Sequence, residues 1–184
     1  DTVMHLASAE ALLESKKDAD SLFPLLAQKY LVSFEDMGAR APGGTTRRFL
    51  NMLKSGTPWN KIPFYKTAGG CGGAMRAMCF GLVFYGEDQR DNLIAASIES
   101  GRMTHNNPTG FFGAFASAAF TAFAIEGKPI VSWGREVLSL FPRAYAYLEK
   151  VGRDWNDYQH NLKYFEEALT HYLKQREILS PDKE

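Results

Sequence analysis

The sequence predicts an all-α protein, and three observations support this prediction. Apolar residues recur at three- and four-residue intervals through most of the chain, as they do on the buried face of a helix. No segment shows the alternation of apolar and polar residues that is typical of a strand. The segment Phe111–Ile125 is apolar or small at almost every position, which is typical of a helix buried on all sides. We therefore expect helices packed around this central segment.

The composition indicates a single domain over residues 1–184. Hydrophobic residues make up 45% of the chain and aromatic residues 13%, enough for a substantial core. The 21 basic and 21 acidic residues balance, so we expect neither nucleic acid nor a membrane as a partner. The apolar run Phe111–Ile125 is shorter than a bilayer-spanning helix. Two cysteines, Cys71 and Cys79, form no disulfide framework and favour a reducing compartment, so a cytoplasmic protein is expected.

Capping residues, glycines and prolines predict where the helices begin and end. The first half is expected to hold a helix capped by Asp1, a helix from Ser21 to Met37 with Pro24 in its first turn, a helix capped by Thr45 or Thr46, an irregular segment over 55–67, and a helix from Ala74 to Gly86. The second half is expected to hold a helix from Asp88 to a left-handed stop at Gly101, a helix from Pro108 to Ile125 ended by Gly127, a helix from Pro129, a short helix after Pro142, and a long helix Trp155–Leu179.

The stretch Gly69–Gly73 is the strongest indication of a binding site. It reads Gly-Gly-Cys-Gly-Gly and precedes the helix expected from Ala74. Glycines allow left-handed conformations, and a glycine-rich turn that opens a helix directs unpaired N–H groups at one point. That arrangement suits a phosphate, although close packing explains a glycine cluster equally well. No Lys-Ser/Thr pair follows, so the stretch is not a Walker loop, and no strand leads into it as in a Rossmann turn.

Three motifs carry a resemblance to a known family. They are Asp1-Thr2-Val3-Met4-His5, Gly-Gly-Cys-Gly followed by Ala-Met-Arg-Ala-Met-Cys, and Ser-Gly-Arg-Met-Thr-His ending at His105. Together they resemble the ADP-ribosylglycohydrolase family, and within it the ADP-ribosylarginine hydrolase branch, over nearly the whole chain. The resemblance implies an orthogonal multi-helix bundle. Because the chain starts at Asp1 without a methionine, it also implies the central part of one domain that lacks both ends, inactive alone and monomeric when complete.

The resemblance implies a site for ADP-ribose and two magnesium ions. Asp1 is implied as a catalytic residue and as one metal ligand, and the remaining ligands as part of an Asp-x-Asp-Ser/Thr motif near the family's C-terminus, expected beyond Glu184. The resemblance places the loop 38–46 against ADP-ribose, and the implied substrate-binding residues are Gly43, Gly44, Gly70, Cys71, Gly72, Gly73 and His105. Taken alone, an aspartate in this position is most often a helix cap and a single histidine most often a core residue.

Two functions from different classes follow from the resemblance. The first is a magnesium-dependent hydrolase that removes ADP-ribose from modified arginine side chains, with ADP-ribosylated proteins and ADP-ribose as partners. The alternative is an inactive family member that binds ADP-ribose or has a structural role, and Asp1 favours the first. Arg76 and Arg102 could neutralise a pyrophosphate or could pair with Glu99 or Asp91.

Overall fold

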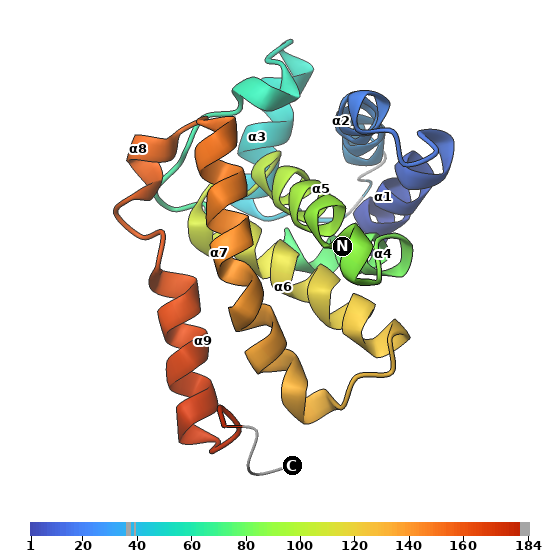
Figure 1. Ribbon diagram of the computed structural model, residues 1–184. Coiled ribbons are helices and arrows are strands. Elements are labelled where there is room, and N and C mark those ends of the chain that lie inside the picture. Colours follow the sequence, from blue (N-terminus) through green and yellow to red (C-terminus); the bar gives the residue numbers. More distant parts are fainter. Residues whose placement is uncertain (36–37, 39, 181–184) are drawn as a thin grey trace.

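Helix α6 (Pro108–Ile125) runs through the centre of the molecule. Helices α4 (Met78–Val83), α5 (Arg90–Arg102), α7 (Trp133–Val151) and α9 (Tyr164–Gln175) pack against it (Figure 1). The computed structural model describes residues 1–35, 38 and 40–180, and every regular element within them is helical. The all-α prediction is confirmed.

Local signals at both ends of α6 explain its limits. The side chain of Asn107 accepts a hydrogen bond from the N–H of Thr109 at 3.0 Å, and Pro108 occupies the first position, where no N–H is needed. Gly127 follows the helix with a φ of +70°, as predicted. The helix begins at Pro108, three residues before the apolar run Phe111–Ile125 that we judged too short to span a bilayer. With this extra length, α6 is the one helix in the described part of the chain long and apolar enough to cross a membrane. However, 61% of it is buried inside the protein, so its place in the core accounts for its composition.

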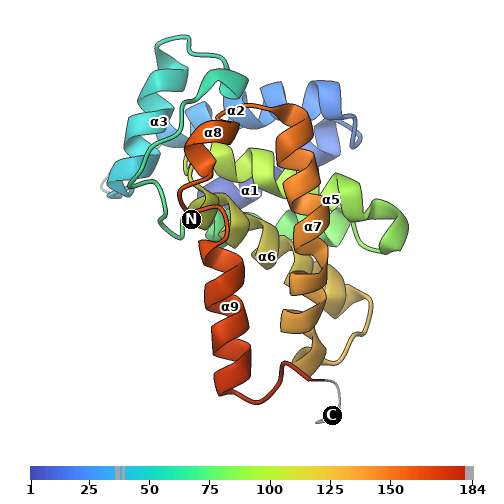
Figure 2. The same ribbon diagram turned by 60° about the vertical axis from the view of Figure 1, so that its left-hand side comes forward.

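Helices α1 (Thr2–Glu14) and α2 (Ala19–Glu35) pack on each other at one side of α4 and α5 (Figures 1 and 2). Asp18, not Ser21, caps α2, since its Oδ2 accepts a hydrogen bond from the N–H of Ser21 at 3.0 Å. Pro24 was predicted to lie in the first turn of this helix, but it lies beyond that turn. The predicted end of this helix at Met37 lies outside the described residues.

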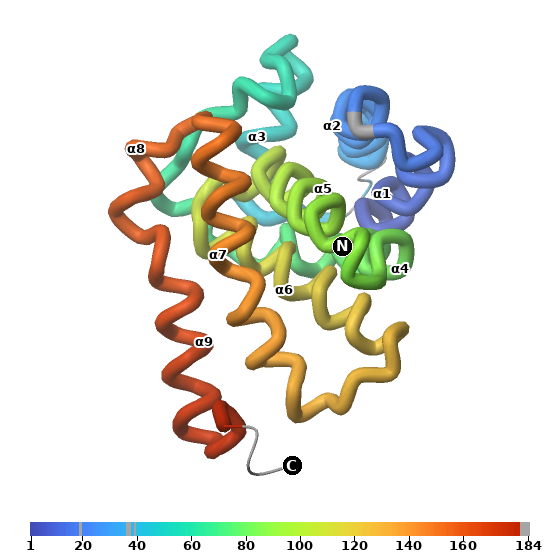
Figure 3. Tube along the Cα trace, in the orientation of Figure 1, coloured from blue at the N-terminus to red at the C-terminus, as the bar shows by residue number. Residues whose placement is uncertain are grey.

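Helix α3 (Gly44–Lys54) begins earlier than predicted. Its N-cap is Gly43, so neither Thr45 nor Thr46 caps it. The following segment is irregular, as predicted, apart from a 3₁₀ turn (η1, Trp59–Lys61). Figure 3 traces this segment from α3 toward α4, and the N–H of Tyr65 in it donates to the carbonyl of Asn106, just before α6, at 3.0 Å.

The helix predicted from Ala74 to Gly86 is broken. Ala74–Arg76 forms a single 3₁₀ turn (η2), and α4 begins only at Met78. Helix α5 follows another 3₁₀ turn (η3, Glu87–Gln89) and continues through Gly101, so the predicted left-handed stop there is wrong. A Cβ atom at Gly101 would lie 2.9 Å from the Cα of Phe111, so this glycine serves the close crossing of α5 and α6.

The C-terminal half contains two further corrections. Helix α7, which a 3₁₀ turn (η4, Ile130–Ser132) precedes, passes through Pro142 without interruption. The neighbouring Phe141 is fully buried, and this packing outweighs the hydrogen bond that proline removes. The predicted helix Trp155–Leu179 is divided into α8 (Trp155–Tyr158) and α9, because residues near the break bind the loop before α6. The hydroxyl of Tyr158 donates to Asn106, and the side chain of Asn161 donates to Asn107.

Gly81 brings the backbones of α4 and α6 together. A Cβ atom there would lie 2.2 Å from the carbonyl oxygen of Ala118 and 2.8 Å from the nitrogen of Ala122. We expect Gly81→Ala to lower the free energy of unfolding by about 3 kcal/mol, because neither backbone atom can move without shifting a helix. Gly113→Ala in α6 is the matched control, since its Cβ would meet nothing closer than 3.7 Å. Urea unfolding followed by circular dichroism measures both, and equal stability would contradict this packing.

Candidate functional site

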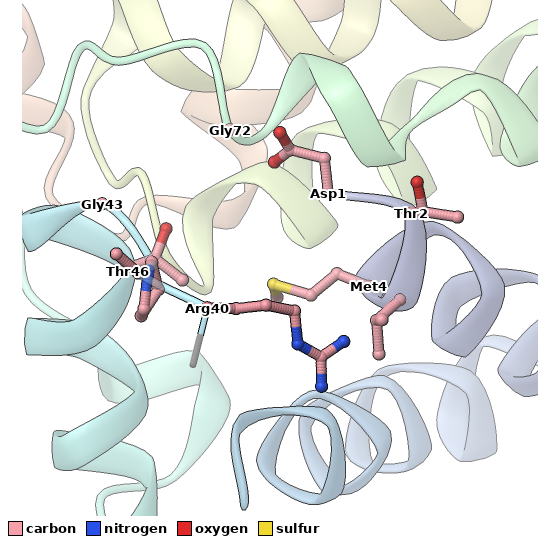
Figure 4. A pocket seen from close by; sticks show the side chains of 10 residues that line it. Asp1, Thr2, Met4, Arg40, Gly43, Thr46 and Gly72 are labelled. Atoms are coloured by element: carbon pink, nitrogen blue, oxygen red, sulfur yellow. The ribbon is translucent and has the colours of Figure 1, made fainter. Parts of the chain in front are cut away.

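A pocket of ≈ 330 Å³ opens between the start of α1 and the segment that leads into α3. Asp1 and Met4 lie on one side, Gly43 and Thr46 on the other, and Gly72 lies beside the Asp1 carboxylate in Figure 4. The pocket therefore joins three segments that are far apart in the sequence.

Asp1 occupies the N-cap position of α1, but its side chain makes no capping hydrogen bond. The residue is exposed, and its carboxylate lies beside Gly72 at the pocket edge (Figure 4). Asp1 therefore has the predicted position of a helix cap, but the interpretation of its side chain as the capping group is wrong. The carboxylate is free to contact a ligand.

The described residues do not by themselves form a magnesium site. No group of three or more His, Cys, Asp or Glu side chains gathers among them, and Asp1 is the one acidic residue in the described lining of the pocket. Magnesium requires a nearly octahedral set of oxygen ligands. Asp1 could supply one of them, and no second carboxylate stands beside it in the described lining of the pocket.

The stretch Gly69–Gly73 differs from the predicted cradle in two ways. None of its glycines has a positive φ. The stretch opens only the single turn η2, so its N–H groups do not face the dipole of a long helix. Close packing is tightest at one of the glycines: a Cβ atom at Gly72 would lie 2.8 Å from Cε1 of His105.

The predicted substrate-binding residues of this stretch lie on different sides of it. Gly72 lines the pocket, whereas Gly70 and the exposed Cys71 line a separate groove beside α6. Gly73 is buried, and a Cβ atom there would lie 3.3 Å from the carbonyl oxygen of Gly110. The structure therefore brings Gly72 to Asp1 but does not bring Gly70, Cys71 or Gly73 there.

Gly43 lines the pocket, whereas Gly44 does not. A Cβ atom at either would meet nothing within 4 Å, so packing inside the described chain gives no reason for glycine at these positions. Thr46 also lines the pocket. It belongs to the loop that the resemblance places against ADP-ribose, although it was not singled out as a binding residue. Its hydroxyl lies 3.7 Å from the place of a Cβ at Gly72. Arg40, from the same loop, lines the pocket as well and was likewise not singled out.

His105 lies beneath the glycine stretch, in the loop between α5 and α6, and only 4% of it is exposed. Its Nδ1 is 2.8 Å from the hydroxyl of Thr104, and its Cε1 and Nε2 lie next to Gly72. Burial, and the positive charge of Arg76, lower the pKa of His105 from 6.5 to about 3, so the imidazole is neutral at pH 7. His105 supports the wall behind Gly72, and its contact with a substrate stays a prediction.

The two arginines considered for a pyrophosphate have different surroundings. Arg102 pairs with Glu99 at 3.0 Å, so its structural alternative is confirmed. Arg76 pairs with neither Glu99 nor Asp91. Its guanidinium donates instead to the carbonyl oxygens of Gly72 at 3.2 Å and Ser100 at 2.5 Å.

The described chain is an all-α protein, and at one pocket a carboxylate meets backbone without side chains, which makes this pocket the candidate site for a polar ligand. The chain matches the ADP-ribosylglycohydrolase family model over residues 1–183 and belongs to that family.

Two relatives agree with this assignment. The chain is 42% identical over 195 residues to ADP-ribosylhydrolase ARH1 of Dictyostelium discoideum, with 99% of this chain and 50% of that protein covered. It is 34% identical over 145 residues to a protein of Acanthamoeba polyphaga mimivirus with the provisional name ADP-ribosyl glycohydrolase, with 76% of this chain and 28% of that protein covered. The chain spans half or less of the length of these curated relatives.

Proposed function

We propose that the protein hydrolyses the bond between ADP-ribose and arginine side chains of modified proteins, with magnesium. The observation that carries this proposal is the meeting of the Asp1 carboxylate with Gly43 and Gly72 at one pocket. Membership of the ADP-ribosylglycohydrolase family and similarity to a protein named ADP-ribosylhydrolase ARH1 support the hydrolase class. The arginine linkage rests on the motifs around Asp1, Cys71 and His105.

The residues at the pocket suit different parts of this reaction. Cleavage of a glycosidic bond builds positive charge on the ribose and needs a nucleophilic water. The Asp1 carboxylate can stabilise such charge and can orient a water by accepting its proton in a hydrogen bond. At Gly43 and Gly72 the ligand can approach the main chain closely, because no side chain intervenes. Magnesium dependence is proposed for the complete protein, with Asp1 as one ligand.

Asp1→Asn tests the proposal, because it keeps the side-chain shape and removes the charge. We expect the release of ADP-ribose from an ADP-ribosylarginine peptide to fall at least about 100-fold, with the magnesium dependence lost. The assay uses the complete protein with and without a chelator, and chromatography quantifies free ADP-ribose. Asp20→Asn, at an exposed position in the first turn of α2, is the control and should leave activity unchanged. Full activity of Asp1→Asn would contradict the role of Asp1.

The same assay distinguishes the alternative function. An inactive member of the family would bind ADP-ribose in calorimetry and release none from any peptide, even with Asp1 intact. A second peptide that carries ADP-ribose on serine tests the linkage. Release from the serine peptide alone would keep the hydrolase class and overturn the choice of arginine.

A further inference from the structure

Within the described residues, three arginines are almost completely buried, and one of them differs from the other two. The exposed fraction is 1% for Arg76 and 2% for Arg90 and Arg102. Arg90 pairs with Glu126 at 2.6 Å, and Arg102 pairs with Glu99 at 3.0 Å. Among the described residues, no carboxylate lies within ion-pair distance of Arg76. Buried charges are normally paired, so the positive charge of Arg76 requires an explanation.

The contacts of Arg76 stabilise its charge without cancelling it. Its guanidinium donates to two neutral carbonyl oxygens, those of Gly72 and Ser100, and lies 4.7 Å from the ring centre of Tyr30. Its Nε is buried without a hydrogen-bond partner. Since Gly72 itself lines the pocket, the guanidinium stands directly behind the pocket wall. Its positive field therefore extends into the pocket through a wall that carries no side chain.

The neighbouring His105 does not supply this charge, because its buried imidazole is neutral at pH 7. The turn η2 is too short to supply it through a helix dipole. We propose that Arg76 is a positioning residue for the diphosphate of the ligand, attracting it to the backbone at Gly72 by charge while making no direct contact. This inference rests on the proposed function, since it takes the ligand of the pocket to be ADP-ribose.

The test compares a charged and an uncharged ligand. Dissociation constants for ADP-ribose and adenosine are measured in the complete protein by calorimetry and by nuclear magnetic resonance titration. We expect Arg76→Met to weaken ADP-ribose binding about tenfold and adenosine binding less than about twofold, because only the former carries negative charge. Arg76→Lys, which keeps the charge, should hold the ratio of the two constants within about threefold of the wild type. Arg90→Met is the matched control for loss of a buried arginine and should leave the ratio unchanged.

The outcomes separate the inference from the proposed function. If the wild type binds no ADP-ribose, the proposed function fails. If the wild type binds it and Arg76→Met weakens both ligands equally, Arg76 is merely structural and the inference is overturned. Should Arg76→Met fail to fold, Arg76→Lys decides: a retained ratio supports the role of charge, and a ratio reduced tenfold overturns it.

Discussion

Replacing Gly72 with valine is expected to weaken ADP-ribose binding by a factor between roughly 10 and 100, with the helical circular dichroism retained. A Cβ atom at Gly72 would lie 2.8 Å from Cε1 of His105 and 3.1 Å from its Nε2. Because His105 is buried in the core, relief of this contact must come from movement of the glycine stretch toward the pocket. The reason is thus a steric contact, and a positive φ plays no part. Calorimetry measures the change in affinity.

Gly70→Ala is the matched comparison for this variant. Its Cβ would make an ordinary contact with Nε2 of His105 at 3.5 Å, and Gly70 lines the groove beside α6 rather than the pocket. We expect Gly70→Ala to change the dissociation constant less than Gly72→Val does. Unchanged affinity in Gly72→Val would leave close packing as the explanation of these glycines. A larger loss in Gly70→Ala would place the ligand in the groove.

Replacing Glu99 with alanine is expected to lower the free energy of unfolding by about 3–5 kcal/mol. The residue is 1% exposed, and its carboxylate accepts hydrogen bonds from Arg102 at 3.0 Å, from Tyr147 at 2.9 Å, and from Arg153. Without Glu99, the buried guanidinium of Arg102 loses its nearest carboxylate. The variant also removes the hydrogen bonds that join α5 to Tyr147 of α7 and to Arg153, just before α8. Urea unfolding measures the loss.

Glu87→Ala is the control for Glu99. Its side chain is 77% exposed, pairs with Arg143 at 2.5 Å and lies 3.7 Å from the buried Arg90, which keeps its closer partner Glu126 at 2.6 Å. An ion pair between exposed side chains contributes less than about 1 kcal/mol, because water already stabilises both charges. Similar losses of stability in the two variants would contradict the view that burial and three hydrogen-bond donors make Glu99 important for stability.

The sequence predicted the elements whose limits depend on local chemistry. Helix α6 begins at Pro108 and ends before Gly127, as the proline and the glycine indicated. The predictions failed where a helix packs against other elements. Pro142 does not end α7, and Gly101 does not end α5, because the buried neighbours of each residue hold the helix together. Local rules for proline and glycine carry no information about such contacts.

The sequence predicted which residues the candidate site could contain, but not which of them lie together at one pocket. The motifs pointed to Asp1 and to the glycine stretch, and the structure places Asp1 and Gly72 at one pocket. They did not indicate that Gly70 and Cys71 face a different groove, because the direction of each main-chain group depends on how the stretch lies over His105. The loop that contains Thr46 was expected at the ligand, but Thr46 itself was not singled out, because a threonine near a helix start fits capping equally well.

By itself, the sequence determined the helical class, the central position of the segment Phe111–Ile125 and the chemical groups available for a site, since these follow from composition and spacing. Only the tertiary structure decided which of those groups are buried, paired or turned toward the pocket. Arg76 shows why: the groups that surround its guanidinium belong to Tyr30, Gly72 and Ser100. Burial and charge pairing depend on contacts between residues far apart in the chain, which no local pattern records.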